Sequence, residues 1–400
     1  MKRKQLTVLL IIFSLWLTGC SAAAVTGVVT PDIAELPTLK HETIFISAVG
    51  DIMMHNTQLI AGLQPGGNTY DYSGFFRYVK PLLGTSDLVI GNLETTLAGK
   101  SAVYSGYPRF NSPDILAANL KEAGFDVLTT ANNHCMDKGY DGLAATLDRL
   151  DEAGLLHAGT ARSQAEQDKR LIVDVKGSKF AILSYTYGTN GLNPPKNRAF
   201  AVNYLDEGKI IADTKKAKEE GAQLVIVALH FGTEYQTRPN PEQTGLAKAL
   251  LDNGADIILG YHPHVLQPAF LIDEKFVIYS LGNFISDQKG LERKSSVILN
   301  LQFAVDPLTE QPYFLTASYI PVWTHRYMQN GKAKFAVLPV EPALTSINMG
   351  QKGNISNTDA ASLLQAWQYI TNHLKSDSPQ IKLQNIPIPL SGLELIKKLR

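Results

Sequence analysis

The sequence of 400 residues contains little cysteine and no excess of charge of either sign. Its 37 basic and 37 acidic residues balance, so the overall charge gives no reason to expect a nucleic-acid partner. It also lacks internal repeats and low-complexity tracts. Hydrophobic residues make up 44% of the chain, which is enough for a large buried core, so we expect a globular protein of one large or two ordinary domains.

The first twenty residues have the features of a targeting segment. A positive start at residues 1–4 precedes an apolar stretch at residues 6–17, and Leu17-Thr18-Gly19-Cys20 provides a cleavage site. This pattern resembles a bacterial lipoprotein signal, in which Cys20 would carry lipid and anchor the protein at the extracytoplasmic face of the cell membrane. The alternatives are an ordinary secretory peptide and an uncleaved anchor. Lipidation would leave Cys135 without a disulfide partner.

Composition divides the chain into four parts. Residues 1–20 are the predicted lipoprotein signal peptide, and residues 21–42, which are small, polar and proline-containing, are a predicted flexible tether. We expect a folded domain at 43–345 and a C-terminal helix with an irregular extension at 346–400.

Short apolar runs alternate with helical patterns in the predicted domain. The predicted strands cover residues 44–49, 88–90, 127–130, 180–185, 224–229, 257–259 and 276–280. The predicted helices cover residues 113–123, 140–153, 207–220 and 241–253, each followed by glycine. This alternation is typical of α/β sheets, in which ligands gather at the carboxyl ends of strands. We expect the later runs 297–303 and 313–323 to form edge strands of the same domain, followed by a helix around 360–373.

Five polar clusters follow predicted strands, which suggests one shared site. They contain six candidate metal ligands: Asp51, Glu94, Asn133, His230, His262 and His264. Carboxylate, amide and imidazole donors together suit a divalent ion, without distinguishing Mn, Fe and Zn. One or two ions could bind, and a carboxylate shared between two would hold them roughly 4 Å apart and activate a water. His134 could then protonate a leaving group.

Each of these residues also has a structural alternative. Asp51 alone would be expected to cap a turn, Glu94 to lie in the first turn of a helix, and His230 to be a hydrogen-bonded structural histidine. The histidine pair at 262 and 264 already favours metal, because two buried imidazoles without partners are costly. The convergence of all six residues favours the metal site.

A second group of residues is predicted to contact substrate: Asn92, Glu234 and Arg238. Arg238 follows His230 on an expected rim loop, where its guanidinium could hold an anionic substrate; a solvated arginine is the alternative. The stretch 189–198 could cover the site as a lid or be an ordinary long loop.

Six motifs in order carry a resemblance to a known family. They are Gly50-Asp51, Gly91-Asn92-Leu93-Glu94, Ala131-Asn132-Asn133-His134, His230-Phe231-Gly232-Thr233-Glu234-Tyr235, Gly260-Tyr261-His262-Pro263-His264 and Ser280-Leu281-Gly282-Asn283-Phe284. From about residue 43 to about 303, the chain resembles the bacterial capsule synthesis protein CapA family, which is associated with poly-γ-glutamate. That family is similar to the calcineurin-like metallophosphoesterases. The resemblance implies an α/β fold, a four-layer α/β/β/α metallophosphoesterase-like sandwich.

The resemblance also implies roles by position. Asp51 would be the first ligand, Glu94 would stand roughly at the bridging carboxylate, and His134 would be the general acid beside the ligand Asn133. His230 would be the lone histidine ligand, and His262 and His264 would serve one metal each.

Two positions depart from the phosphoesterase pattern. Met53 stands where those enzymes usually have a histidine, and His55 would lie about 7 Å further along a strand. Asn92 and Glu94 replace the usual paired aspartates. These departures leave one metal position short of ligands, so a mononuclear or weakly occupied second site is an alternative to a binuclear one.

The leading hypothesis is a membrane-anchored protein that takes part in synthesis, export or attachment of an anionic capsule polymer through a metal-dependent hydrolase-like site. Its partners would be the membrane, the polymer and subunits of a membrane synthase. One alternative is a non-catalytic assembly or polymer-binding subunit of that synthase. Another is a general extracytoplasmic metallophosphatase.

Overall fold

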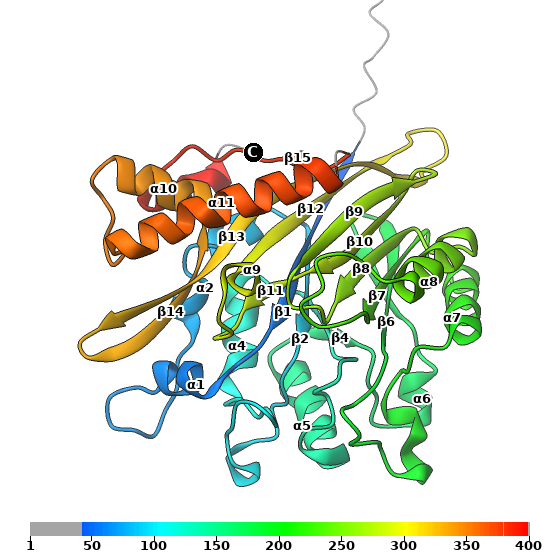
Figure 1. The fold of residues 1–400 in the computed structure, drawn as a ribbon. Coiled ribbons are helices and arrows are strands. Elements are labelled where there is room, and N and C mark those ends of the chain that lie inside the picture. The colour runs from blue at the N-terminus through cyan, green and yellow to red at the C-terminus, as the bar shows by residue number, and fades with distance from the viewer. Residues whose placement is uncertain (1–41, 379, 399–400) are drawn as a thin grey trace, which may run out of the picture. The chain divides into compact units, whose positions relative to one another are not determined.

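The computed structural model describes residues 42–378 and 380–398 (Figure 1). Contacts divide the chain into the units Met1–Lys40 and His41–Arg400, and the description concerns the second unit. The predicted signal peptide, Cys20 and nearly all of the predicted tether lie outside the described residues. Within the described range, no helix is both long enough and apolar enough to cross a membrane.

A nine-stranded mixed sheet contains both the first and the last strands of the unit. Its main path is β14-β13-β12-β1-β2-β3-β4, with β11 beside β1 and β15 beside β13. The strands are β1 (Thr43–Ile52), β2 (Leu88–Leu93), β3 (Val127–Thr129), β4 (Leu156–Ala158), β11 (Asn283–Ile285), β12 (Ser295–Val305), β13 (Pro312–Gln329), β14 (Lys332–Pro339) and β15 (Lys382–Leu383). β1 to β4 run parallel, whereas β12 pairs antiparallel with both β1 and β13.

A second sheet has six strands in the order β5-β6-β7-β8-β10-β9. They are β5 (Leu171–Val175), β6 (Ser178–Thr186), β7 (Leu224–His230), β8 (Ile257–Tyr261), β9 (Leu266–Ile272) and β10 (Lys275–Leu281). The four central strands are parallel, and β5 and β9 are antiparallel edges. The parallel strands direct the polar residues at their carboxyl ends to one edge.

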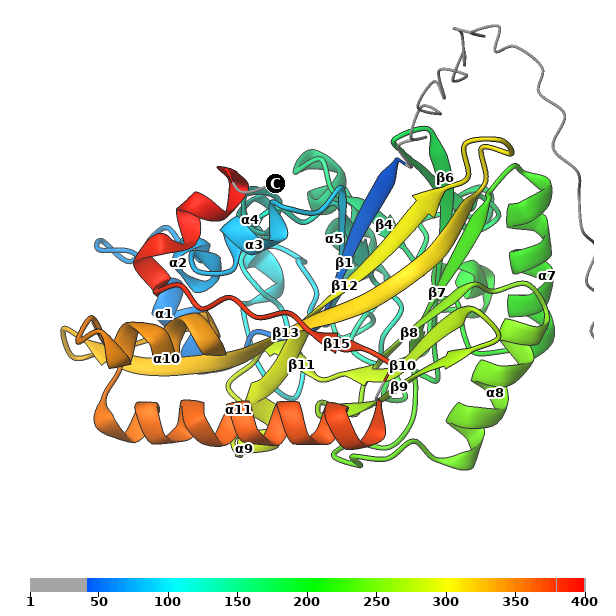
Figure 2. The ribbon, with the colours of Figure 1, turned by 90° about the horizontal axis from the view of Figure 1, so that it is seen from above.

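Helices surround the two sheets: most cover the outer faces, and the long C-terminal helix packs against β9 and β13. They are α1 (Asn56–Gly62), α2 (Ser73–Phe76), α3 (Lys80–Leu83), α4 (Ile115–Ala123), α5 (Gly139–Glu152), α6 (Gln164–Gln167), α7 (Glu207–Glu219), α8 (Pro241–Asp252), α9 (Leu291–Lys294), α10 (Val340–Asn348) and α11 (Asn357–Asp377), with 3-10 turns η1 (Lys100–Ala102), η2 (Lys196–Ala201) and η3 (Leu390–Lys398). Figure 2 shows α7 and α8 on one side of the strands and α2 to α4 on the other.

Separate apolar cores fill the spaces between the layers. Ile46 of β1 and Ile226 of β7 belong to the core between the sheets. Leu120 of α4 and Leu147 of α5 pack with the outer face of the larger sheet, and α7 and α8 share a third core with the smaller one. Burial of these faces is the main stabilising term of such a fold. The architecture is therefore the predicted four-layer α/β/β/α sandwich.

The predicted strands and helices are confirmed, and the bounds of the four predicted helices differ by at most two residues from those in the structure. The glycine stops have a physical basis. Gly124 follows α4 with a φ of 107°, and Gly254 follows α8 with a φ of 108°, a left-handed conformation that residues with a Cβ rarely adopt.

The prediction that residues 297–303 and 313–323 form edge strands is wrong. β12 lies between β1 and β13, and β13 lies between β12 and β14, so β14 is the edge. Residues 295–299 are buried on both faces, and such an unbroken buried run is the mark of an internal strand. The segment after residue 345 belongs to the same unit, with α11 contributing Ile370 and Leu374 to the core between the sheets.

Candidate metal centre

The candidate ligands come from the carboxyl ends of strands in both sheets. Asp51 lies near the end of β1, Glu94 directly follows β2, and Asn133 follows β3. His230 ends β7, and the loop after β8 carries the other two histidines. All six predicted ligands are buried, none with more than 4% of its surface exposed. The fold has therefore brought six polar side chains from five strand ends into its interior.

Short contacts join the six predicted ligands. The His264 Nδ1 atom lies 3.2 Å from an Asp51 carboxylate oxygen, and the His230 Nε2 atom lies 3.0 Å from the Asn133 amide oxygen. The Glu94 Oε1 atom lies 3.8 Å from a ring nitrogen of His230 and 3.8 Å from one of His264. The rings of His230 and His262 are 4.9 Å apart between centroids. The structure thus brings together the residues that the sequence predicts as ligands.

Three buried atoms that could bind a metal have no hydrogen-bond partner within the described residues. They are both carboxylate oxygens of Glu94 and the Nδ1 atom of His262. The separations of 3.8 Å around Glu94 are too long for hydrogen bonds. A buried carboxylate without a donor is costly unless a cation accepts its charge. These atoms therefore fit a divalent ion.

The pKa values of the cluster without a cation also agree with a metal site. Burial, followed by the nearby charge of Asp51, raises the pKa of Glu94 well above its ordinary value. Burial also lowers the pKa of His230 well below its ordinary value and that of His262 to about 3. The imidazoles of His230 and His262 are therefore neutral, which is the form that binds metal.

Two sets of three donors can each surround one ion. Asp51, Glu94 and His230 form the inner set, and Glu234, His262 and His264 form the outer set. Within each set the ligand atoms lie within 4.8 Å of one another. Carboxylate and imidazole donors of this kind suit Mn, Fe and Zn.

His134 is held by a residue that the sequence analysis did not select. Its Nδ1 atom lies 2.7 Å from a carboxylate oxygen of Asp137, which also accepts a 2.6 Å hydrogen bond from the Phe110 amide. The Phe110 ring packs edge-on against the imidazole at 4.7 Å. An Nδ1 that donates to Asp137 leaves Nε2 free to exchange a proton, as a general acid requires. The signal for Asp137 was its position three residues after His134.

Other supporting residues were also missed. The Asn283 side-chain oxygen lies 3.0 Å from His264 Nδ1, and the Asn190 side-chain oxygen accepts a 3.4 Å hydrogen bond from Asn133. The ring of Tyr187 lies 4.6 Å from that of His262. Asn283 and Asn190 occur in segments that were noted in the sequence, but their partners are distant along the chain.

The backbone at the centre is tightly constrained. A Cβ at Gly50 would meet the Gly282 carbonyl oxygen at 1.9 Å, and one at Gly260 would meet that of Tyr279 at 1.9 Å. His262 and His264 have φ values of 95° and 60°, a strained region for residues with side chains. Such strain is often found at functional sites, and here it directs both imidazoles inward.

Comparison with known proteins gives the affiliation of the chain. The family model of the bacterial capsule synthesis protein PGA_cap matches residues 45–288, which is more than half of the chain and includes every predicted ligand. The chain belongs to this family.

The PGA_cap assignment agrees with individual relatives. Capsule biosynthesis protein CapA of Bacillus anthracis is 34% identical over 281 residues, which cover 68% of this chain and 66% of that protein. PGA biosynthesis protein CapA of Bacillus subtilis is 32% identical over 282 residues, which cover 66% of this chain and 70% of that protein. The match thus spans just under two thirds of the first relative's length.

Among solved structures, calcineurin-like phosphoesterase YfkN from Bacillus subtilis is similar with a TM-score of 0.44 and 16% identity, covering 84% of this chain and 99% of that chain. A likeness at this distance carries no conclusion about activity. The PGA_cap family and the α/β/β/α sandwich together confirm the family resemblance inferred from the motifs.

The residues predicted to contact substrate occupy different places in this PGA_cap protein. Asn92 is buried and donates a 2.8 Å hydrogen bond to Asp51, so its amide positions a ligand. Arg238 forms a 2.9 Å ion pair with Asp377 of α11 and is not brought to the ligands by any described contact. Glu234 lies beside the outer histidines. Substrate contact by these residues stays a prediction.

Met53, which stands where phosphoesterases usually have a histidine, is buried directly after β1, and His55 two residues later is partly exposed. Met53 offers a thioether in place of an imidazole. His55 lies at the start of α1, where its Nδ1 atom accepts a 3.3 Å hydrogen bond from the Asp287 amide and lies 3.3 Å from Gln58 Oε1. Burial lowers the pKa of His55 to about 4. It belongs to neither donor set.

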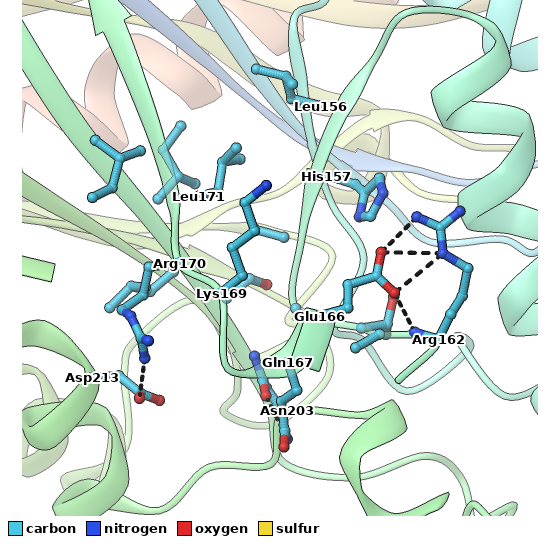
Figure 3. Close-up of a pocket in the computed structure, with 18 of the residues that line it drawn as sticks. Leu156, His157, Arg162, Glu166, Gln167, Lys169, Arg170, Leu171, Asn203 and Asp213 are labelled. Atoms are coloured by element: carbon cyan, nitrogen blue, oxygen red, sulfur yellow. Dashed lines mark hydrogen bonds and ion pairs between the residues drawn. The ribbon is translucent and has the colours of Figure 1, made fainter. Parts of the chain in front are cut away.

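A cavity of about 1010 Å³ lies away from the metal ligands, against the edge strands β4 and β5. Figure 3 shows two interacting pairs among its charged side chains. Arg162 and Glu166 are 2.6 Å apart, and Arg170 and Asp213 are 3.4 Å apart. The cavity contains none of the candidate ligands, so the chemistry of this PGA_cap protein is better sought at the strand ends.

Proposed function

We propose that this protein takes part in the synthesis, export or attachment of an anionic capsule polymer such as poly-γ-glutamate, through a divalent-metal hydrolase-like site. Lipid attached to Cys20 would hold it at the extracytoplasmic face of the membrane, near synthase subunits. The observation that carries the proposal is the buried Glu94 carboxylate, which has no hydrogen-bond partner among the described residues and lies between two imidazoles in a chain of the capsule synthesis family.

Each part of the centre would have a defined task. Asp51, Glu94, Asn133 and the three histidines would hold one or two divalent ions, which when bound would supply Lewis acidity for hydrolysis of a phosphate ester or an amide. His134 would donate a proton from Nε2 to the leaving atom, with Asp137 fixing the ring. Asn92 and Asn283 would keep Asp51 and His264 in place.

Metal content tests the proposal directly. Elemental mass spectrometry on protein purified without chelators is expected to show one or two ions per chain. A folded His262→Ala/His264→Ala variant is expected to lose metal, whereas a His373→Ala control in α11 should retain it. No bound metal in the wild type, even after Mn²⁺ or Zn²⁺ is supplied, would contradict the proposal.

A second candidate is a non-catalytic assembly or polymer-binding subunit of a capsule synthase. The observations that favour it are Met53 and Asn92, which supply a thioether and an amide at positions where a hydrolase would use stronger ligands. Capsule output in cells that carry the His262→Ala/His264→Ala variant separates the candidates. Normal output with a folded variant would support the assembly role, and lost output would support chemistry.

A further inference from the structure

The outer donor set contains Glu234, a residue that the sequence predicts to contact substrate and not metal. Glu234 lies in the loop after β7, and its carboxylate comes within 4.8 Å of ring nitrogens of both His262 and His264. The inner set of Asp51, Glu94 and His230 has no member in common with it. The two sets offer two adjacent positions for ions, because His264 of the outer set lies 3.2 Å from Asp51 of the inner set.

The loop that carries Glu234 is fixed against the histidine loop by backbone contacts. The Tyr235 amide donates a 2.8 Å hydrogen bond to the carbonyl of Pro263, the residue between the two histidines. The Phe231 amide donates a 3.1 Å hydrogen bond to the Tyr261 carbonyl. Glu234 is thus tied on both sides to the segment that contains its partners.

Two buried glutamines hold the same loop through side-chain hydrogen bonds. Gln267 donates a 2.8 Å hydrogen bond from its side chain to the Gln236 carbonyl and also contacts the Arg238 carbonyl at 3.1 Å. Gln243 of α8 donates a 2.9 Å hydrogen bond to Gln267 in turn. Support of this kind is typical of residues that position a functional side chain.

Side chains around Glu234 add to this support. The Arg293 guanidinium lies 4.8 Å from the centre of the neighbouring Tyr235 ring. On the other side, His262 presents a buried Nδ1 atom that has no partner within the described residues. A solvated carboxylate on an exposed loop does not need an unpartnered imidazole beside it.

We propose that Glu234 is a metal ligand and that, with His262 and His264, it forms an outer position for a second divalent ion. The inference rests on the metal centre of the proposed function and adds a ligand to it. Because Glu234 is exposed whereas the inner ligands are buried, the outer ion exchanges with solvent more readily than the inner one.

Titration with Mn²⁺ tests the assignment without an assay of activity. Chelator-treated full-length protein is titrated by calorimetry, and metal content is then measured after dialysis. The wild type is expected to take up two ions. Glu234→Gln should take up one, or bind the second at least ~10-fold more weakly. Glu234→Asp, which keeps the carboxylate, should lie between them, and Glu242→Gln, an exposed acid on α8, should match the wild type.

The outcomes separate the two proposals. Uptake by Glu234→Gln that equals the wild type in number and affinity would overturn the role of Glu234 and leave the inner centre standing. A wild type that binds a single ion would also overturn the outer position. A wild type that binds no Mn²⁺, with no other metal present, would overturn the metal centre itself.

Discussion

Acid should destabilise the metal-free protein, and His262 should account for a measurable share of the effect. Burial, followed by electrostatic repulsion from the neighbouring His264, lowers the pKa of His262 from 6.5 to about 3. Between those pH values the unfolded chain binds a proton on this imidazole and the folded protein does not. The free energy of unfolding therefore falls as the pH drops below 6.5.

The magnitude follows from these two pKa values. Between pH 7 and pH 5, protonation of the unfolded imidazole lowers the free energy of unfolding by about 2 kcal/mol. His55, whose pKa is about 4, adds a contribution of the same sign. Glu94 acts in the opposite direction, because its raised pKa lets the folded protein bind a proton that the unfolded chain has released. A comparison of wild type with His262→Gln at two pH values cancels the last two contributions.

Urea denaturation in the presence of chelator, followed by tryptophan fluorescence, gives the required free energies. Between pH 7 and pH 5 the wild type should lose about 2 kcal/mol more than His262→Gln. The exposed Glu242→Gln variant should lose as much as the wild type. Equal losses in wild type and His262→Gln would refute the reasoning, because the imidazole would then titrate alike in both states.

Three further predictions concern the surroundings of the ligands. Gly260→Ala should lower the free energy of unfolding by about 3 kcal/mol, since the new Cβ would meet the Tyr279 carbonyl oxygen at 1.9 Å; a loss below about 0.5 kcal/mol in urea would contradict the crowding. Asp137→Asn should reduce turnover of any ester or amide that the wild type cleaves by roughly 100-fold, because His134 loses its carboxylate partner. Its metal content should be unchanged, and loss of metal would instead indicate a structural role. Arg238→Ala should leave metal content and turnover unchanged and alter stability by less than about 1 kcal/mol, since the Arg238 side chain is largely exposed; a clear fall in turnover would support the predicted substrate contact.

The sequence predicts the strands and helices well because the relevant signals are local, whereas the four layers were implied by the family resemblance. Apolar runs of strand length, helical periodicity and a terminating glycine such as Gly124 are all contained in windows of about a dozen residues. The order of the strands is not local. β12 pairs with β1 across about 250 residues, as the contact between Ser47 and Asn300 shows, and no window contains that information.

The candidate ligands could be predicted because each ends an apolar run, and parallel strands place such ends together. Their supports could not be predicted in the same way. Asn283 and Tyr187 touch histidines on other strands, and their types alone give no reason to select them. Met53 made one metal position look short of a ligand. Glu234 compensates only if the loop after β7 folds back onto Pro263, which depends on a backbone hydrogen bond.

The central place of β12 has a consequence for how the chain can fold. The match to the family model ends at residue 288, before β12 begins at Ser295. A chain that stopped there would leave β1, the strand that carries Asp51, with an open row of amides and carbonyls along most of one side. During synthesis β1 can pair with β12 only after about 250 more residues have been added. Such distant pairing is slow and leaves an unpaired strand edge that can promote aggregation. The segment up to residue 288 should therefore not fold on its own. A truncation that ends there should aggregate although it keeps all six ligands.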